Sequence, residues 1–545
     1  MQIPPLCKIF STRDKRTAFS SENLIFDFLL NAVRYFYFMV TIHSAQITGL
    51  HATLIPIEVD VSPGLHVFSI VGLADKEVQE SRERVGAAIR NIEGRSPHKQ
   101  SGRIIVSLAP ADIKKEGPHF DLPIALGYLV ASRQAVFNAN KKLFLGELGL
   151  DGNLRPVRGI LSIALTAEKA GFTELFVPKG NGAEGALVHN LAVYEFENLQ
   201  QLLEHLEGRA IQRPLPHTNF ESETHTTGID FTDIAGQFAA KRALEIAAAG
   251  GHNILLWGPP GSGKTMLAKA FPGILPPMDF EEALQVTNIH SIAGLLPQKS
   301  SLVTKRPIRA PHHTASTAAI IGGGTNPTPG EITLAHRGVL FLDEFPEFQR
   351  AVIEALREPL EEKVITVARA RGKVTYPANV ILLAAMNPCP CGNKNHPKKE
   401  CVCRETDIQK YQRKISGPIL DRIDLYVEVP FLEYEILRQA PSQTETSLAI
   451  RARVSRARET QKMRFKKEGT SSNSDMNTKE LKRFAVISTE SDEVMKKAVA
   501  RFALSARSCT RILKVARTIA DLAGSEHIAT DHITEALQYR PQFEN

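Results

Sequence analysis

A glycine-rich segment near the middle of the chain has the composition and spacing of a phosphate-binding loop (P-loop). It reads GPPGSGKT and matches the pattern G-x-x-x-x-G-K-[ST]. An apolar run (ILLW) precedes it and a helical run (MLAKAF) follows, so backbone amides can surround phosphate oxygens at a helix start. We predict that Lys264 reaches the β- and γ-phosphates of ATP and that Thr265 holds Mg²⁺. The complete predicted loop is Gly258, Pro259, Pro260, Gly261, Ser262, Gly263, Lys264 and Thr265.

Three polar residues follow strand-like apolar runs downstream of this loop. GVLFL is followed by Asp343 and Glu344, and LLAAM is followed by Asn387. Ligands of open α/β sheets bind at the carboxyl ends of the strands, so these side chains are candidates for the same site. Asp343 would position Mg²⁺, Glu344 would polarise the attacking water and Asn387 would contact the γ-phosphate. Taken alone, an Asn before a Pro is equally typical of a turn.

Two arginines complete the set of candidate catalytic residues. Arg422, in the segment ILDRID, could point across a subunit boundary and stabilise the charge that develops on a neighbour's ATP. The alternative for Arg422 is a surface ion pair with Asp421 or Asp424. Arg507 lies at the start of a predicted helix that ends near Leu522, and it could contact the nucleotide of its own subunit.

Four of the six cysteines lie close together in the sequence. They form a C-x-C-x9-C-x-C pattern. Four thiolates within such a short segment can close a tetrahedral structural Zn²⁺ site, and four free or redox-active thiols are the alternative. His396 could replace one ligand, but four cysteines make that replacement unnecessary. The predicted zinc ligands are Cys389, Cys391, Cys401 and Cys403.

Basic residues are concentrated around the cysteines. Residues 364–414 contain ten Lys and Arg against three acids, and VITVARARGKVTY within them reads as two strands around a turn near Gly372. Such a hairpin is either a DNA-phosphate contact or a solvated basic surface. Elsewhere, His312 and His313 are adjacent and would point apart on a helix or strand, which favours a structural or coupling role over a metal site.

These segments must be positioned by several domains. The chain has 545 residues, 43% of them hydrophobic and 23% charged, with a formal net charge of +7. These values are typical of globular proteins, and the length suits three or four domains. Clustered cysteines and the lack of a long uncharged apolar run predict a cytoplasmic protein without a membrane span.

Strand-like and helical runs divide the chain into five parts. Apolar β-branched runs alternate with helical stretches in two α/β domains, and the last part is mostly helical. Met39 opens the regular pattern, so the residues before it are an extension or follow a misassigned start. The predicted parts are 1–38 (extension), 39–206 (α/β), 207–228 (linker), 229–432 (P-loop α/β) and 433–545 (helical).

The order of these motifs resembles the AAA+ ATPases, and most closely the branch that contains magnesium chelatase ATPase subunits and the ComM/YifB family. Further similar stretches are SPGLHVFSIVGLADKEVQESRERV, LAPADIKKEGPHFDLPIALG, KRALEIAAAGGHN, RAPHHTAS, ISGPILDRIDL and SARSCTRILKVARTIADL. Together they cover nearly everything from Met39 onward, and members of the family begin near that position. The resemblance also favours zinc at the four cysteines.

The resemblance implies a ring-forming, hexameric ATPase with a C-terminal helical lid of the magnesium-chelatase type. It further implies a helicase that moves branched or single-stranded DNA during recombination in natural transformation. In similar AAA+ helicases a hairpin before the Asn-bearing strand projects into the central pore. The residues that would hold DNA phosphates there are Arg369, Arg371 and Lys373.

The first α/β domain resembles the proteolytic domain of Lon proteases between Gly146 and Pro178. A protease of this type needs a Ser nucleophile and a Lys base. His119 follows the Gly117-Pro118 pair where the Ser is expected, and Leu161 occupies the Lys position. We therefore predict a Lon-like domain without proteolytic activity, used for assembly or substrate contact.

Three other functions are compatible with the motifs. The chain could be a chelatase motor that inserts Mg²⁺ into a porphyrin, although the Lon-like domain and the cysteines argue against this. It could be an ATP-dependent protease if a Ser/Lys pair formed elsewhere. It could also be a DNA-binding scaffold with an inactive ATPase, which the complete set of nucleotide residues makes the weakest alternative.

Overall fold

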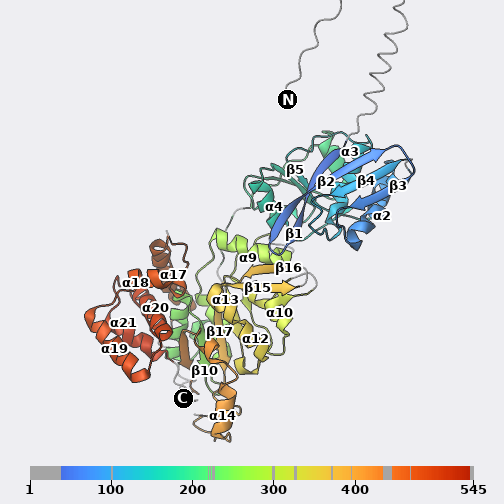
Figure 1. Ribbon diagram of the computed structural model, residues 1–545. Helices are drawn as coiled ribbons and strands as arrows, with labels where there is room; N and C mark the ends of the chain where they lie inside the picture. The colour runs from blue at the N-terminus through green and yellow to red at the C-terminus, as the bar shows by residue number, and fades with distance from the viewer. Residues whose placement is uncertain are drawn as a thin grey trace, which may run out of the picture.

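The computed structural model describes most of the chain from Met39 onward. The described residues are 39–99, 102–218, 220, 223, 228–296, 301–324, 328–369, 372–394, 396–433, 445–466 and 468–540. The expected extension 1–38 lies outside them, as does part of the expected linker. Figure 1 shows an N-terminal unit, a central unit that carries the P-loop, and a group of C-terminal helices on the far side of the central unit.

The N-terminal unit is built on a mixed seven-stranded sheet with the order β3-β4-β2-β1-β5-β8-β9. Strands β1, β2 and β4 are antiparallel neighbours, whereas the pairs β3/β4, β1/β5, β5/β8 and β8/β9 are parallel. The strands are β1 (Val40–Thr48), β2 (His51–Ser62), β3 (Val67–Val71), β4 (Arg103–Leu108), β5 (Lys142–Phe144), β8 (Glu174–Pro178) and β9 (Ala192–Phe196); β6 (Glu147–Leu148) and β7 (Leu154–Arg155) form a separate pair.

Helices cover both faces of this sheet because its strands alternate apolar side chains between two cores. One core includes Ile42, and the other includes Ala45. The helices are α2 (Lys76–Asn91), α3 (Asp121–Ala131), α4 (Ile160–Lys169), α5 (Gly182–Gly185) and α6 (Leu199–Leu206).

The central unit is built on a parallel five-stranded sheet with the order β11-β14-β17-β10-β18. Its strands are short, and the three central ones (β14, β17 and β10) are almost fully buried, as expected for a parallel sheet covered on both faces. The strands are β10 (Ile254–Trp257), β11 (Ile308–Arg309), β14 (Val339–Leu342), β17 (Ile381–Met386) and β18 (Leu425–Glu428).

Helices and two hairpins surround this sheet. The helices are α7 (Phe238–Gly250), α8 (Lys264–Ala270), α9 (Phe280–Ile292), α10 (Thr317–Ile321), α11 (Glu331–Leu334), α12 (Arg350–Ala355), α13 (Arg357–Glu362), α14 (Glu405–Gln412) and α15 (Gly417–Leu420). The hairpins are β12 (Gly322–Gly323) with β13 (Thr328–Pro329), and β15 (Val364–Arg369) with β16 (Gly372–Pro377).

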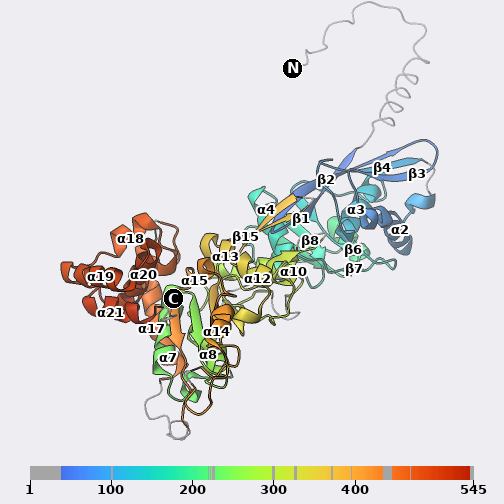
Figure 2. The same cartoon turned by 60° about the horizontal axis from the view of Figure 1, so that its bottom comes forward.

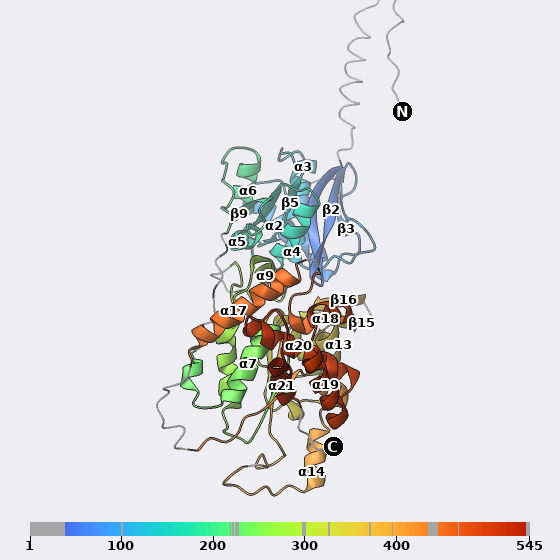
Figure 3. The same cartoon turned by 90° about the vertical axis from the view of Figure 1, so that its left-hand side faces the viewer.

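The C-terminal helices are α17 (Ser447–Arg464), α18 (Thr478–Phe484), α19 (Thr489–Phe502), α20 (Ala506–Leu522) and α21 (Thr530–Gln538). They share one hydrophobic core with α7 and with the strands of the central sheet. Polar contacts reinforce this packing, because Arg242 on α7 pairs with Glu535 on α21 and Gln461 donates to the carbonyl of Ala249. Figure 3 shows α17 and α20 lying beside α7.

The N-terminal and central units share a hydrophobic cluster. Leu161 and Ala164 of α4 belong to the same cluster as Val286 of α9, together with Met278, Ala283 and Leu302. Beside it, the backbone N–H of Gly159 donates to Ser291 Oγ at 2.9 Å, and Ser291 in turn donates to the buried carboxyl group of Glu184. Burial raises the pKa of Glu184.

The turn between β1 and β2 touches the β15–β16 hairpin. Gly49 has φ +64°, and a Cβ atom there would lie 2.5 Å from Cγ1 of Val374. The carbonyl of Leu50 accepts hydrogen bonds from Ser162 on α4 and Asn288 on α9. The turn therefore joins the N-terminal unit to two elements of the central unit.

Among the described residues, no helix combines the length and apolar character that crossing a membrane requires.

Candidate nucleotide site and cysteine cluster

The P-loop connects β10 to α8, and its lysine lies in the middle of a polar network. Lys264 Nζ donates to the carbonyl oxygens of Gly258 at 2.7 Å and Pro259 at 2.9 Å, and to Asn387 Oδ1 at 3.3 Å. From behind the loop, Gln237 Nε2 donates to the carbonyls of Ser262 and Pro430. Burial lowers the pKa of Lys264 to about 8, although the charge of Asp343 opposes this shift.

The two acids after β14 have different partners. Asp343 Oδ2 accepts a hydrogen bond from Thr265 Oγ1 at 2.9 Å, so the two proposed Mg²⁺ ligands already contact each other. Glu344 has φ +52° and its Oε2 lies 3.2 Å from His313 Nδ1. The parallel register places Leu342 opposite Ala384 and Trp257 opposite Met386. The P-loop, the acids and Asn387 therefore share the carboxyl edge of the sheet.

The sequence favoured a structural or coupling role for the histidine pair and indicated no contact with either acid. In the structure, His313 contacts Glu344. His312 instead hydrogen-bonds the hydroxyl of Thr314 at 2.9 Å. The expectation that the two histidine side chains point apart is wrong, because they lie in a turn and their ring centroids are 4.2 Å apart. Two residues separate the histidines from β11, an edge strand of only two residues. The only sequence signal for a role at the nucleotide site was their position in the RAPHHTAS stretch.

Arg422 and Arg507 lie near each other and away from the P-loop of their own chain. The carbonyl of Arg422 accepts from Asn253 Nδ2, just before β10, whereas the P-loop follows this four-residue strand. At the usual rise, the strand separates the two ends by about 13 Å. Burial and the charge of the exposed Arg507 lower the pKa of Arg422.

The neighbouring contacts agree with this placement at the amino edge of the sheet. Arg511, one helical turn after Arg507 on α20, donates to the carbonyl of Ile423 at 3.2 Å. Arg422 pairs with Glu361, so neither acid expected as its surface partner, Asp421 or Asp424, forms this ion pair. The expectation that Arg507 serves the nucleotide of its own subunit has no support in this geometry.

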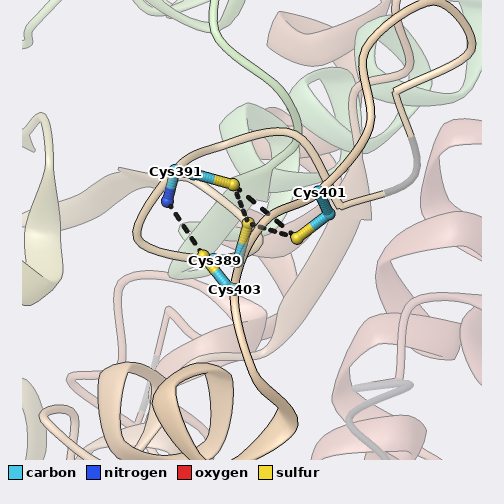
Figure 4. Close-up of side chains that lie close together, drawn as sticks. All are labelled: Cys389, Cys391, Cys401 and Cys403. Carbon is cyan, nitrogen blue, oxygen red and sulfur yellow. Dashed lines mark hydrogen bonds between the residues drawn. The ribbon is translucent and has the colours of Figure 1, made fainter.

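The four cysteines form a compact cluster (Figure 4). Three Sγ–Sγ distances are 3.5, 3.6 and 3.7 Å, and all four sulfur atoms lie within 4.8 Å of one another. Tetrahedral Zn²⁺ with Zn–S distances of about 2.3 Å requires Sγ–Sγ edges of about 3.8 Å, so the sulfur positions fit such a metal. Burial raises the pKa of Cys389, whereas a hydrogen bond from the backbone of Asn393 lowers that of Cys391. His396 packs against Phe431 with tilted rings and does not belong to the cysteine cluster.

The basic hairpin has the expected two-strand form. Residues Val364–Arg369 pair antiparallel with Gly372–Pro377, and Lys373 is exposed opposite Ala368. Arg371 and the side chain of Arg369 lie outside the described residues. Figures 1 and 3 show the hairpin on the side of the central unit that faces the N-terminal unit.

The two positions at which a Lon protease would carry its Ser and Lys hold His119 and Leu161 in the N-terminal unit. His119 is partly buried and contacts the carbonyl of Ala45 through Nε2, and desolvation of its ring lowers its pKa to about 4. Leu161 is buried, and its backbone N–H donates to Glu184. Neither side chain can supply the Ser or Lys chemistry of a Lon protease.

The parallel sheet, the P-loop and the residues gathered around it define a P-loop nucleotide-binding protein of the AAA+ class. Three protein-family models match the chain. The model described as magnesium chelatase, subunit ChlI, matches residues 230–437; that of subunit ChlI of Mg-chelatase matches 57–181; and that of the ChlI C-terminal part matches 444–540.

Relatives match over nearly the whole chain. Competence protein ComM of Haemophilus influenzae is 43% identical over 92% of this chain and 97% of its own length. YifB of Salmonella typhimurium is 42% identical over 92% and 97%, and YifB of Escherichia coli is 41% identical over 92% and 96%. The chain therefore belongs to the ComM/YifB family of magnesium-chelatase-like AAA+ proteins.

We predict that His313 orients Glu344 for ATP hydrolysis. Replacing His313 with Ala removes the contact to the carboxylate but leaves the P-loop intact, so kcat for ATP hydrolysis should fall about tenfold while KM stays unchanged. His312→Ala is the comparison variant: His312 contacts the hydroxyl of Thr314 and the ring of His313 but no acid, so its loss of kcat should be smaller. His313→Gln should restore part of kcat. Equal losses in the His312 and His313 variants would contradict the prediction.

The buried Lys264 also predicts a pH dependence of nucleotide binding. Below pH 8 the amine is charged both with and without nucleotide, so affinity should be constant. Phosphate charge raises the pKa of Lys264 in the complex, so above pH 8 binding must take up a proton and affinity should fall, by up to about tenfold per pH unit. Titration with a fluorescent ATP analogue measures this slope. Arg does not titrate in this range, so Lys264→Arg should abolish it; an equal slope in both proteins would refute the assignment.

Proposed function

We propose that the chain is an ATP-driven motor that moves DNA. The observation that carries the proposal is the convergence of Lys264, Asn387, Thr265 and Asp343 in two linked contacts at one sheet edge. Glu344, held by His313 beside them, is the group that takes a proton from the attacking water. The site thus contains a phosphate-binding loop, two metal-binding oxygens and a base.

Each residue has one role in the proposed reaction. Lys264 and the P-loop amides bind the phosphates, and Asn387 positions the γ-phosphate. Thr265 and Asp343 hold Mg²⁺, which neutralises phosphate charge when bound. Arg422 and Arg507 lie together at the opposite sheet edge, so we assign both to the nucleotide of a neighbouring subunit. The site is then complete only in an assembly, for which we propose a hexameric ring.

The β15–β16 hairpin is the proposed DNA contact. Lys373 is exposed on it, and the sequence adds the positive charges of Arg369 and Arg371. Such a hairpin grips single-stranded or branched DNA through phosphates without reading sequence. Because a relative that is 43% identical is called a competence protein, we propose branch migration of recombination intermediates in natural transformation as the task.

The flanking units have supporting roles in this proposal. We propose that residues 39–206 are a Lon-protease-like domain without proteolytic activity, which serves assembly or substrate contact. Residues 433–545 act as the helical lid, and the core that α17 and α20 share with α7 supports this assignment. The four cysteines hold a structural Zn²⁺, in agreement with their sulfur spacing.

The test of the motor is resolution of a synthetic four-way DNA junction. We expect ATP-dependent resolution by the intact protein and none by Lys264→Ala, because the variant loses the ammonium group that binds the phosphates. Gel separation of labelled products measures the outcome. Active, DNA-stimulated ATPase without junction resolution would refute branch migration and leave ATP hydrolysis standing.

The assigned base has its own test. Glu344→Gln keeps the size and polarity of the side chain but cannot take a proton, so the variant should bind ATP and hydrolyse it at least about a hundredfold more slowly. Filter binding with labelled ATP and phosphate release measure the two properties. Normal turnover by Glu344→Gln would show that another group is the base.

A chelatase motor is the second candidate, because all three matching family models are named after a magnesium chelatase subunit. The same ATPase assay separates the two functions. Stimulation by a tetrapyrrole and not by DNA would favour chelation, and stimulation by DNA alone would favour the DNA motor.

A further inference from the structure

We propose that the cysteine knuckle, residues 389–403, is a positioning element of the P-loop, so that metal binding by the four cysteines sets the affinity for nucleotide. The inference rests on the proposed function for its metal and its nucleotide, and it adds a physical link between the two sites. Three contacts between the knuckle and the walls of the nucleotide site carry the proposal.

The first contact joins the knuckle directly to the P-loop. Gly392 has φ +77°, and its N–H donates to the carbonyl of Cys389 at 3.0 Å, which closes a turn between the first two cysteines. A Cβ atom at Gly392 would lie 2.6 Å from both Cγ and Cδ of Pro260. The backbone of Gly392 therefore packs directly against the ring of Pro260, and this ring cannot rotate away as a flexible side chain could.

The second contact reaches Asn387. Only Pro388 separates this residue from the first sulfur ligand, Cys389. The Cβ position of Gly392 lies 3.9 Å from Cγ of Asn387, whose Oδ1 accepts from Lys264. A displacement of the turn therefore acts on the P-loop and on the residue proposed to position the γ-phosphate.

The third contact involves the chain that leaves the central sheet. The ring of His396 packs against that of Phe431, with a centroid distance of 4.7 Å and an interplanar angle of 39°. The preceding residue, Pro430, offers its carbonyl to Gln237, which also binds the carbonyl of Ser262 in the P-loop. The knuckle thus contacts both the P-loop and the segment of Pro430 and Phe431, which Gln237 links to the P-loop by hydrogen bonds.

The metal supplies the stiffness that these contacts need. Within residues 389–394 and 396–403 the structure has no helix or strand, and backbone hydrogen bonds such as Gly392 to Cys389 and His396 to Asn393 are few. Four thiolate ligands would fix this irregular loop, since metal binding in small knuckles supplies their folding free energy. Without metal, little in the loop holds Gly392 against Pro260.

A substitution tests the link without removing the metal. Gly392→Ala places a methyl group against Pro260, so we expect nucleotide affinity to fall about tenfold, a change of about 1.4 kcal/mol. Gly524→Ala is the matched control: Gly524 has φ +68°, but nothing lies within 4 Å of its Cβ position. Both variants thus carry the same backbone strain. Titration with a fluorescent ATP analogue measures affinity, and elemental analysis measures zinc.

A double variant separates the contact from damage to the knuckle itself. Pro260→Ala removes the Cγ and Cδ atoms that the new methyl group meets. In that background Gly392→Ala should cost less affinity than in the parent chain, which a double-mutant cycle measures. Equal costs in the two backgrounds, or unchanged affinity in a zinc-loaded Gly392→Ala protein, would overturn the inference.

Cobalt substitution tests whether nucleotide binding changes the geometry of the metal site. Co²⁺ bound by four thiolates has visible absorption bands that depend on ligand geometry, and we expect ADP to shift them in the full chain. Lys264→Ala should show no shift, because it does not bind nucleotide. A protein that takes up neither Zn²⁺ nor Co²⁺ would refute the zinc site itself. A cobalt-loaded protein that binds ADP with an unchanged spectrum would refute only the link.

Discussion

The buried ammonium group of Lys264 is the interaction around which the nucleotide site is organised. A charged amine with little access to water needs acceptors, and here it has two P-loop carbonyls and the amide oxygen of Asn387. These acceptors come from two neighbouring parallel strands, so the contact exists only because β10 and β17 end in register. Phosphate oxygens can replace the carbonyls as partners, so the loop has the geometry of a phosphate-binding site.

The sequence predicted the local elements around this lysine well, because their signals are local. The P-loop, the apolar run before Asp343 and the strand before Asn387 lie within one or two residues of the expected places. In each of these segments, hydrophobic periodicity and turn residues agree with the final packing.

Contacts between segments that are far apart in the sequence could not be predicted in the same way. Nothing in the spacing of Gly392 indicates that it rests on Pro260, since that contact depends on where a strand and a loop end in space. The placement of Arg507 beside Arg422 depends on how α20 packs on the central unit, whereas the helix pattern showed only that α20 exists. The contact between His313 and Glu344 could not be predicted either. It depends on where β11 places the histidines, and β11 is too short to give a strand pattern in the sequence.

The hydrophobic cluster between α4 and α9 shows that the N-terminal and central units do not have fully separate hydrophobic cores. The chain passes from one unit to the other through a polar segment, yet Leu161 and Val286 pack in one continuous apolar interior. If the chain were cut at that segment, each fragment would expose an apolar surface complementary to that of the other fragment. The hydrogen bond between Ser291 and Glu184 would also be lost. Such fragments would aggregate or re-associate, so the boundary in the sequence does not mark a boundary of independent folding.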